Sequence, residues 1–251
     1  MRHLPYVKET YTCGDVIEVE KYYSSRYGKK GCKRGQARKT TSEEQLKINE
    51  RNAAKQLRRL IETNFAPGDY HLVLTYRREL RPTPDTAKGR LEKFLRGLRK
   101  EFKQMGGDLK YICVTEKEAR SIHHHLIIPA CDPSLITKHW PWGRPHITQM
   151  DEVGGYKALA DYLIKETSRT FGTANSVQGK RYNASRNLTK PNVKREIVKA
   201  DSWRETPSAP RGWMVDADSI QTGSHAVTGY AYQTYRLVRI SKSRPPGKKK
   251  E

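Results

Sequence analysis

The stretch Ile122-His123-His124-His125-Leu126-Ile127-Ile128 predicts a β-strand that carries three histidines between apolar residues. Successive side chains of a strand point to opposite faces, so His123 and His125 share one face and His124 lies on the other. Two imidazoles two residues apart on a strand can serve as a pair of metal ligands. The stretch alone leaves open an ordinary strand with surface histidines.

The sequence on either side of this strand predicts an α+β domain. Ser42 and Gln45 have the spacing of a capping box, and Thr83-Pro84 is typical of a helix N-cap followed by proline at the first helical position. Apolar periodicity predicts helices over 43–64, 84–105 and 155–168, and strands over 70–76, 110–116, 146–150 and 230–240. A hairpin joins 110–116 to the histidine strand. This order favours a central antiparallel β-sheet with helices packed on it.

The segments outside this domain are polar and basic. We expect residues 1–41 to form a basic N-terminal arm, residues 42–190 to form the main domain, and residues 191–240 to form a C-terminal extension packed on it. Residues 241–251 hold lysine, arginine, proline and glycine, and we expect a disordered basic tail there.

The charge of the chain indicates a polyanionic partner. The 251 residues carry a formal net charge of +22 at pH 7, which favours nucleic acid first and an anionic membrane surface second. The sequence contains no apolar run of membrane-spanning length and no signal-peptide core, so we expect a cytoplasmic protein without a membrane partner. Its four cysteines form no CxxC pair and it has no Walker A loop, which argues against a zinc ribbon and a nucleotide-driven motor.

The predicted hairpin brings a carboxylate close to the paired histidines. Glu116 ends the strand before the turn, and strand pairing places it beside His123 and His125. Two histidines and a carboxylate form a ligand set for a divalent ion that acts as a Lewis acid. Glu118 is the alternative carboxylate ligand, and a surface charge at the strand end is the alternative role for Glu116.

The helix predicted after Gly155 carries a tyrosine that could act as a nucleophile. Tyr162 lies at the edge of the apolar stripe, and Lys165 lies three residues on, on the same side of the helix. A tyrosine can form a covalent intermediate when a nearby cation or metal favours its phenolate. The alternative is a packed aromatic beside a solvated lysine. We assign Tyr156, in the middle of the stripe, to the core.

Together these motifs resemble those of the HUH endonucleases. The resemblance rests on Leu74-Thr75-Tyr76, on the His-x-His strand, on Tyr162-x-x-Lys165, and on their order along residues 43–190. Within that superfamily the chain is most similar to replication-associated proteins of the gene II kind, as the stretches 111–116, 142–146 and 180–188 also suggest. The resemblance implies a Rep nuclease fold of the ferredoxin-like or RRM-like type. It departs from the family pattern at His124, where a leucine or isoleucine is usual.

The resemblance implies a rolling-circle replication initiator that nicks single-stranded origin DNA at a hairpin or cruciform. His123, His125 and Glu116 would hold Mg²⁺ or Mn²⁺. Tyr162, assisted by Lys165, would attack the phosphate, leaving a 5′-phosphotyrosine link and a free 3′ hydroxyl. A host helicase and polymerase, a monomeric or weakly dimeric state, and the cytoplasm of a bacterial host are also implied.

A basic and aromatic segment follows the nuclease motifs. Lys180, Arg181, Tyr182 and Arg186 are candidate DNA contacts, with a solvated basic loop as the alternative. Arg96, Arg99 and Lys100 are expected on the solvated face of a helix. Two other functions stay open: a non-catalytic basic nucleic-acid-binding protein, and a single-tyrosine HUH transposase.

Overall fold

The computed structural model describes residues 6–24, 43–118, 121–151, 156–168, 179–198, 204–224 and 229–240. The chain divides into two compact units. Residues 38–190 form one unit, and residues 1–37 together with 191–251 form the other. Each unit contains an antiparallel five-stranded sheet, which confirms the predicted α+β class.

The central unit is built on a sheet with the strand order β6-β3-β5-β4-β7. Its elements in chain order are α1 (Glu43–Asn64), β3 (Tyr70–Leu74), the short 3₁₀ helix η1 (Arg78–Leu80), α2 (Pro84–Gln104), β4 (Ile112–Glu118), β5 (Ser121–Ile128), α3 (Pro133–His139), β6 (Pro145–Gln149), α4 (Lys157–Ser168) and β7 (Asn183–Ala184). The helices and strands predicted over residues 43–168 are all present. The elements α3, η1 and β7 were not predicted from the sequence.

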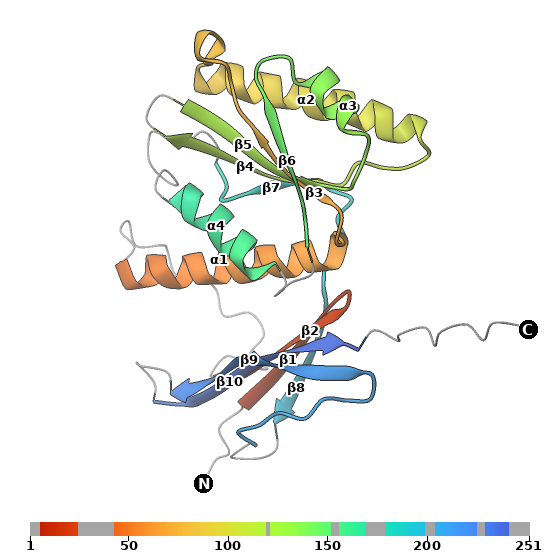
Figure 1. The fold of residues 1–251 in the computed structure, drawn as a ribbon. Helices are drawn as coiled ribbons and strands as arrows, with labels where there is room; N and C mark the ends of the chain where they lie inside the picture. The colour runs from red at the N-terminus through yellow and green to blue at the C-terminus, as the bar shows by residue number, and fades with distance from the viewer. Residues whose placement is uncertain are drawn as a thin grey trace, which may run out of the picture. The chain divides into compact units, whose positions relative to one another are not determined.

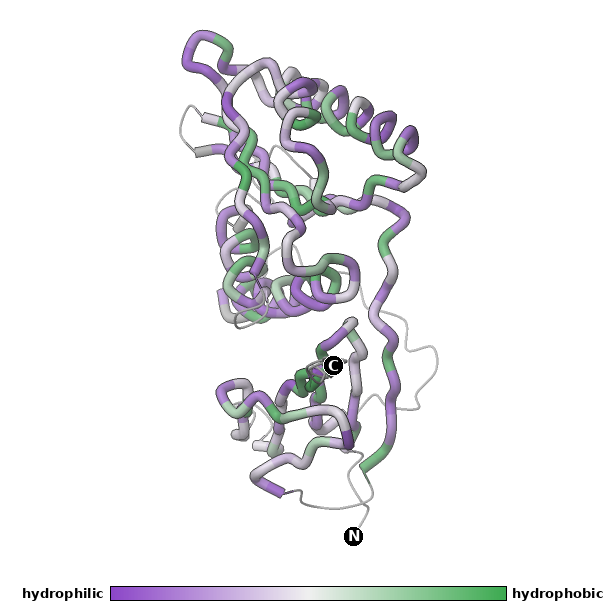
Figure 2. Tube along the Cα trace, turned by 45° about the vertical axis from the view of Figure 1, so that its right-hand side comes forward, coloured by the Kyte–Doolittle hydropathy of each residue, from purple (hydrophilic) through white to green (hydrophobic). Residues whose placement is uncertain are grey.

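Helices cover both faces of this sheet (Figure 1): α1 and α4 lie on one face and α2 and α3 on the other. The α2 side packs around Phe94, Leu98, Leu126 and Trp140, all nearly inaccessible to solvent. The α1–α4 side packs around Leu57, Ile61, Ile127 and Leu163. Figure 2 shows hydrophobic stretches within the central unit, and hydrophobic residues alternate with hydrophilic ones along its helices, as expected for helices that pack one face on a sheet.

Two local sequence signals set the position of α2. The Thr83 side chain accepts a hydrogen bond from the Thr86 backbone N–H, and Pro84 occupies the first helical position, as predicted. The helix ends before Gly106, whose φ of 80° lies in the left-handed region that glycine adopts most easily.

The second unit pairs the two ends of the chain in one sheet. Its strands are β1 (Tyr6–Cys13), β2 (Val16–Tyr23), β8 (Asn192–Val198), β9 (Trp213–Ser224) and β10 (Ala231–Arg239), in the order β8-β1-β2-β10-β9. We predicted an arm over 1–41 and an extension over 191–240 packed on the main domain. Residues 6–23 form a hairpin, and β8 and β10 pair with its two strands. The predicted tail, 241–251, lies outside the described residues.

Candidate metal and tyrosine site

Strand pairing brings the predicted ligands onto one face of the central sheet. Glu116 of β4 lies directly opposite His123 of β5, and Val114 lies opposite His125. Directly opposite residues of an antiparallel pair share a face, so Glu116, His123 and His125 all lie on the α1–α4 side. The Nε2 atom of His125 is 3.3 Å from Oε2 of Glu116. The predicted juxtaposition of carboxylate and imidazole is therefore present.

The His125 imidazole is neutral near physiological pH. Burial, together with the nearby His123, lowers the pKa of His125 to about 4, although the charge of Glu166 opposes this shift. A neutral ring has one N–H and one lone pair. With the proton on Nδ1, which is buried and has no hydrogen-bond partner in the described part of the chain, the lone pair on Nε2 faces the Glu116 carboxylate. A cation between Nε2 and this carboxylate would be bound by both groups.

Two residues near His125 were not assigned a role from the sequence. His71 of β3 stacks on the His125 ring, with the ring centroids 5.6 Å apart and the planes inclined by 14°. It reaches this position because Val73 pairs opposite His125, so His71, two residues earlier, shares the same face. Its Nε2 atom is also buried without a hydrogen-bond partner among the described residues, and burial followed by the influence of His125 lowers the pKa of His71 to about 4.

Glu166 is the second such residue. It lies on α4, four residues after Tyr162, and its negative charge acts on His125. Residues four apart on a helix are neighbours on one face. The spacing of Tyr162 and Glu166 was available from the sequence, but only the packing of α4 on the sheet relates them to His125.

The donor types at this site fit a divalent cation. Imidazole nitrogens and carboxylate oxygens are ligands of Mn²⁺, and Mg²⁺ favours the carboxylate more strongly. Within the described residues, no group of three or more His, Cys, Asp or Glu side chains is arranged to hold a metal ion. The side chain of Glu118, the alternative ligand, lies outside the described residues.

Tyr162 projects from α4 over the same face of the sheet. Its ring meets the His125 ring edge to face, with the centroids 5.5 Å apart and an interplanar angle of 76°. Ala160 and Leu163 of the same helix are buried in the core, whereas Tyr162 remains 42% exposed. Lys165 is exposed as well. The helix therefore holds the Tyr162 phenol beside the histidines and within reach of solvent.

The middle histidine of the triplet has a different environment on the α2 side of the sheet. His124 is inaccessible to solvent, its Nε2 lies 2.8 Å from the Tyr76 hydroxyl, and its Nδ1 lies 2.9 Å from Oγ1 of Thr115. The edge of the ring also contacts Trp140. A polar residue occupies this apolar layer because both of its ring nitrogens have partners.

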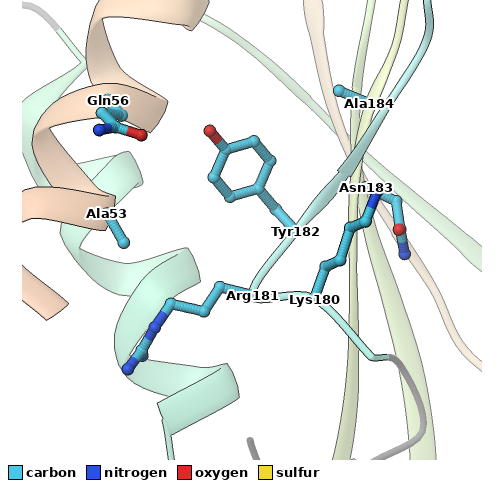
Figure 3. Close-up of a pocket in the computed structure, with 7 residues that line it drawn as sticks. All are labelled: Ala53, Gln56, Lys180, Arg181, Tyr182, Asn183 and Ala184. Atoms are coloured by element: carbon cyan, nitrogen blue, oxygen red, sulfur yellow. The ribbon is translucent and has the colours of Figure 1, made fainter. Parts of the chain in front are cut away.

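The basic segment lies along the edge strand β7. Lys180, Arg181, Tyr182 and Asn183 line a pocket of about 450 Å³ together with Ala53 and Gln56 of α1 (Figure 3). The Tyr182 ring points toward α1 and packs against the α1–α4 core, and burial raises its pKa.

The cations of this pocket differ in their partners. Arg181 lies 3.9 Å from the Glu50 carboxylate of α1, which places it in an intramolecular ion pair. Lys180 is exposed. Arg186 is also exposed and lines a separate pocket on the other side of β7. The four predicted DNA contacts are therefore divided between two pockets rather than forming one surface.

One comparison relates this region to known proteins. No curated protein and no solved structure matches the chain significantly. No helix among the described residues is long and apolar enough to cross a membrane. Residues 69–167, from β3 to the end of α4, match the family model of replication-associated proteins of the ORF2 and gene II type. This segment contains Glu116, the histidine triplet, Tyr162 and Lys165, and its similarity to that family supports a replication protein of the initiator type.

Proposed function

We propose that this protein is a replication initiator that nicks single-stranded origin DNA by tyrosine transesterification. The observation that carries the proposal is the contact between the Tyr162 and His125 rings, on the sheet face that also carries Glu116. A tyrosine nucleophile in contact with a group that can bind a divalent ion is an arrangement that supports phosphoryl transfer to the tyrosine. The match to replication-associated proteins over 69–167 supports the same function.

His123, His125 and Glu116 are the residues that would hold Mn²⁺ or Mg²⁺, with His71 behind His125. A bound divalent ion would supply Lewis-acid polarisation of the scissile phosphate. The neutral state of His125 and the position of its Nε2 beside the Glu116 carboxylate fit this role. By stacking on His125, His71 limits the orientations open to the ligand ring.

In the proposed reaction, the Tyr162 oxygen attacks the phosphorus in line with the bond to the 3′ oxygen. The new O–P bond forms as that P–O bond breaks. The phenolic proton ends on the departing 3′ oxygen, so no net proton or electron is gained or lost. The exposed ammonium of Lys165 stabilises the phenolate before attack or the phosphate during it. The tyrosine ester retains the energy of the broken bond, so the strand can be rejoined without ATP.

A denaturation-resistant adduct tests this proposal. The full-length protein is incubated with Mn²⁺ and single-stranded DNA from the replicon that encodes it, and the products are separated under denaturing conditions. We expect a covalent protein–DNA species with the wild type and its loss with Tyr162→Phe. Tyr156→Phe is the matched control, because Tyr156 lies just before the first residue of the same helix and packs against the core.

Three outcomes decide between the candidate functions. DNA binding without any adduct would favour the non-catalytic binding protein. An adduct that persists in Tyr162→Phe would assign the nucleophile to another residue and overturn the proposal. An adduct that transfers its DNA to a second duplex rather than priming synthesis would favour the transposase.

A further inference from the structure

The second pocket beside β7 has the composition of a phosphate-binding site. It measures about 620 Å³, and its lining includes three cations, Arg99, Lys103 and Arg186, together with Tyr111 and one carboxylate, Asp108. Arg99 and Lys103 come from the last turns of α2, and Arg186 comes from the segment after β7. Cations from two parts of the chain thus line one hollow that is large enough for a nucleotide.

The cations of this pocket are available for a ligand. Within the described part of the chain, Arg99, Lys103 and Arg186 form no ion pair with a carboxylate. Arg99 instead lies over the Tyr111 ring, 5.5 Å from its centroid, and its Nη2 donates to the Tyr111 hydroxyl at 3.2 Å. This contact orients the guanidinium against an aromatic face and leaves its remaining N–H groups free of a competing carboxylate.

Hydrogen bonds fix the walls of the pocket. The backbone N–H of Ser185 donates to the Tyr111 carbonyl at 2.9 Å, and the Tyr111 N–H donates to Oγ of Ser185 at 3.0 Å. The Asn187 side chain donates to the Leu109 carbonyl at 3.3 Å. The segment that carries Arg186 is already held by hydrogen bonds to residues 109–111. Ligand binding therefore does not have to order this segment.

We propose that this pocket binds a backbone phosphate of the DNA strand, with Arg99, Lys103 and Arg186 as the contacts and the Tyr111–Arg99 pair as a stacking surface for a base. Ala184 of β7 lines both this pocket and the one lined by Lys180, and β7 is an edge strand of the sheet. A DNA strand that passes over this edge can contact both pockets. The inference rests on the DNA-binding part of the proposed function and not on the tyrosine chemistry.

The matched variants come from a single helix. Arg99→Ala/Lys103→Ala removes two charges from the pocket, and Arg96→Ala/Lys100→Ala removes two charges of the same kinds from exposed positions of α2 that do not line it. Both pairs are measured in a Tyr162→Phe background, so that only non-covalent binding is observed. The probes are fluorescent oligothymidylates of increasing length, with inorganic phosphate as a competitor that distinguishes a free anion from DNA.

We expect the pocket variant to bind long oligothymidylates about tenfold more weakly, because two charge-assisted phosphate contacts are partly lost. The slope of log K against log salt should become shallower by about 0.7, since one single-strand phosphate is no longer neutralised. The control pair should change affinity by no more than about twofold, as expected for exposed charges away from the strand. The shortest oligonucleotides should also lose affinity in the pocket variant when they occupy this pocket, because the same two cations contact their phosphate.

Equal losses in the pocket and control variants would overturn the inference, because binding would then follow total charge alone. Binding of inorganic phosphate with no effect on DNA would also overturn it. If an adduct forms at Tyr162 but the pocket substitutions leave the affinity for DNA unchanged, only this inference is refuted. Pocket-dependent binding without any adduct would refute only the nicking function.

Discussion

Replacing His124 by leucine tests how the central sheet accommodates a histidine in its apolar layer. Leucine has a similar volume, so packing against Trp140 is largely kept. The substitution removes both hydrogen bonds of the imidazole and leaves the hydroxyls of Tyr76 and Thr115 without these partners. Thr115 is 6% exposed and Tyr76 is half-buried. Thr115 also shares a hydrogen bond with Cys113, so the hydroxyl that loses its partner is that of Tyr76. At about 1–3 kcal/mol for an unsatisfied buried group, we expect His124→Leu to lower the free energy of unfolding by about 1–3 kcal/mol.

The compensating variants make this prediction specific. Adding Thr115→Val and Tyr76→Phe removes the two hydroxyls that contact His124, so the triple variant should recover part of the lost stability. The free energy of unfolding is measured by urea denaturation at neutral pH. Hydrogen exchange in peptides of β3 to β5 then measures the stability of the central unit separately from that of the other unit. A His124→Leu protein as stable as the wild type would refute the reasoning, as would a triple variant less stable than the single one.

Three further perturbations test other parts of the account. Phe94 is fully buried on the α2 side, so Phe94→Ala should cost about 3–5 kcal/mol in the same denaturation assay, and a loss below about 1 kcal/mol would contradict the described core. Glu116→Gln should weaken Mn²⁺ binding at least about tenfold by calorimetry and leave the fold intact; unchanged binding would remove Glu116 from the ligand set. In the second unit, burial opposes the ionisation of Glu9, but hydrogen bonds from Tyr11 and Tyr22 and the charge of Arg195 outweigh it and lower the pKa of Glu9. The resulting stabilisation is present at neutral pH and is lost as the pH falls below 4.5 toward the folded pKa. Glu9→Gln should therefore make the free energy of unfolding less dependent on pH at acidic pH. An unchanged pH dependence would show that Glu9 does not stabilise the fold in this way.

Most of the central unit follows from local sequence patterns. The capping signal at Thr83, the apolar periodicity of α1 and α2, and the alternation within residues 122–128 each depend on neighbouring residues only. The hairpin between β4 and β5 is also local, and it was sufficient to predict that Glu116 and His125 lie close together.

The parts that were missed depend on pairing between distant residues. β1 pairs with β8, which lies near the other end of the chain, and no local pattern specifies that partner. The hairpin of β1 and β2 did carry a signal, a two-residue Gly14-Asp15 turn in which Gly14 adopts a φ of 61°. The polar strands on either side of it obscured the alternation. The stacking of His71 on His125 could not be predicted, because the register between β3 and β5 is set by tertiary packing.

Mapping the DNA-linked residue tests the central claim most directly. The adduct formed with Mn²⁺ and origin DNA is digested with protease and nuclease, and the peptides are sequenced by mass spectrometry. We expect a nucleotide phosphate attached to Tyr162 in the peptide that contains α4. Attachment to any other residue, or the absence of a linked peptide when cognate DNA is cleaved, would contradict the assignment of Tyr162 as the nucleophile.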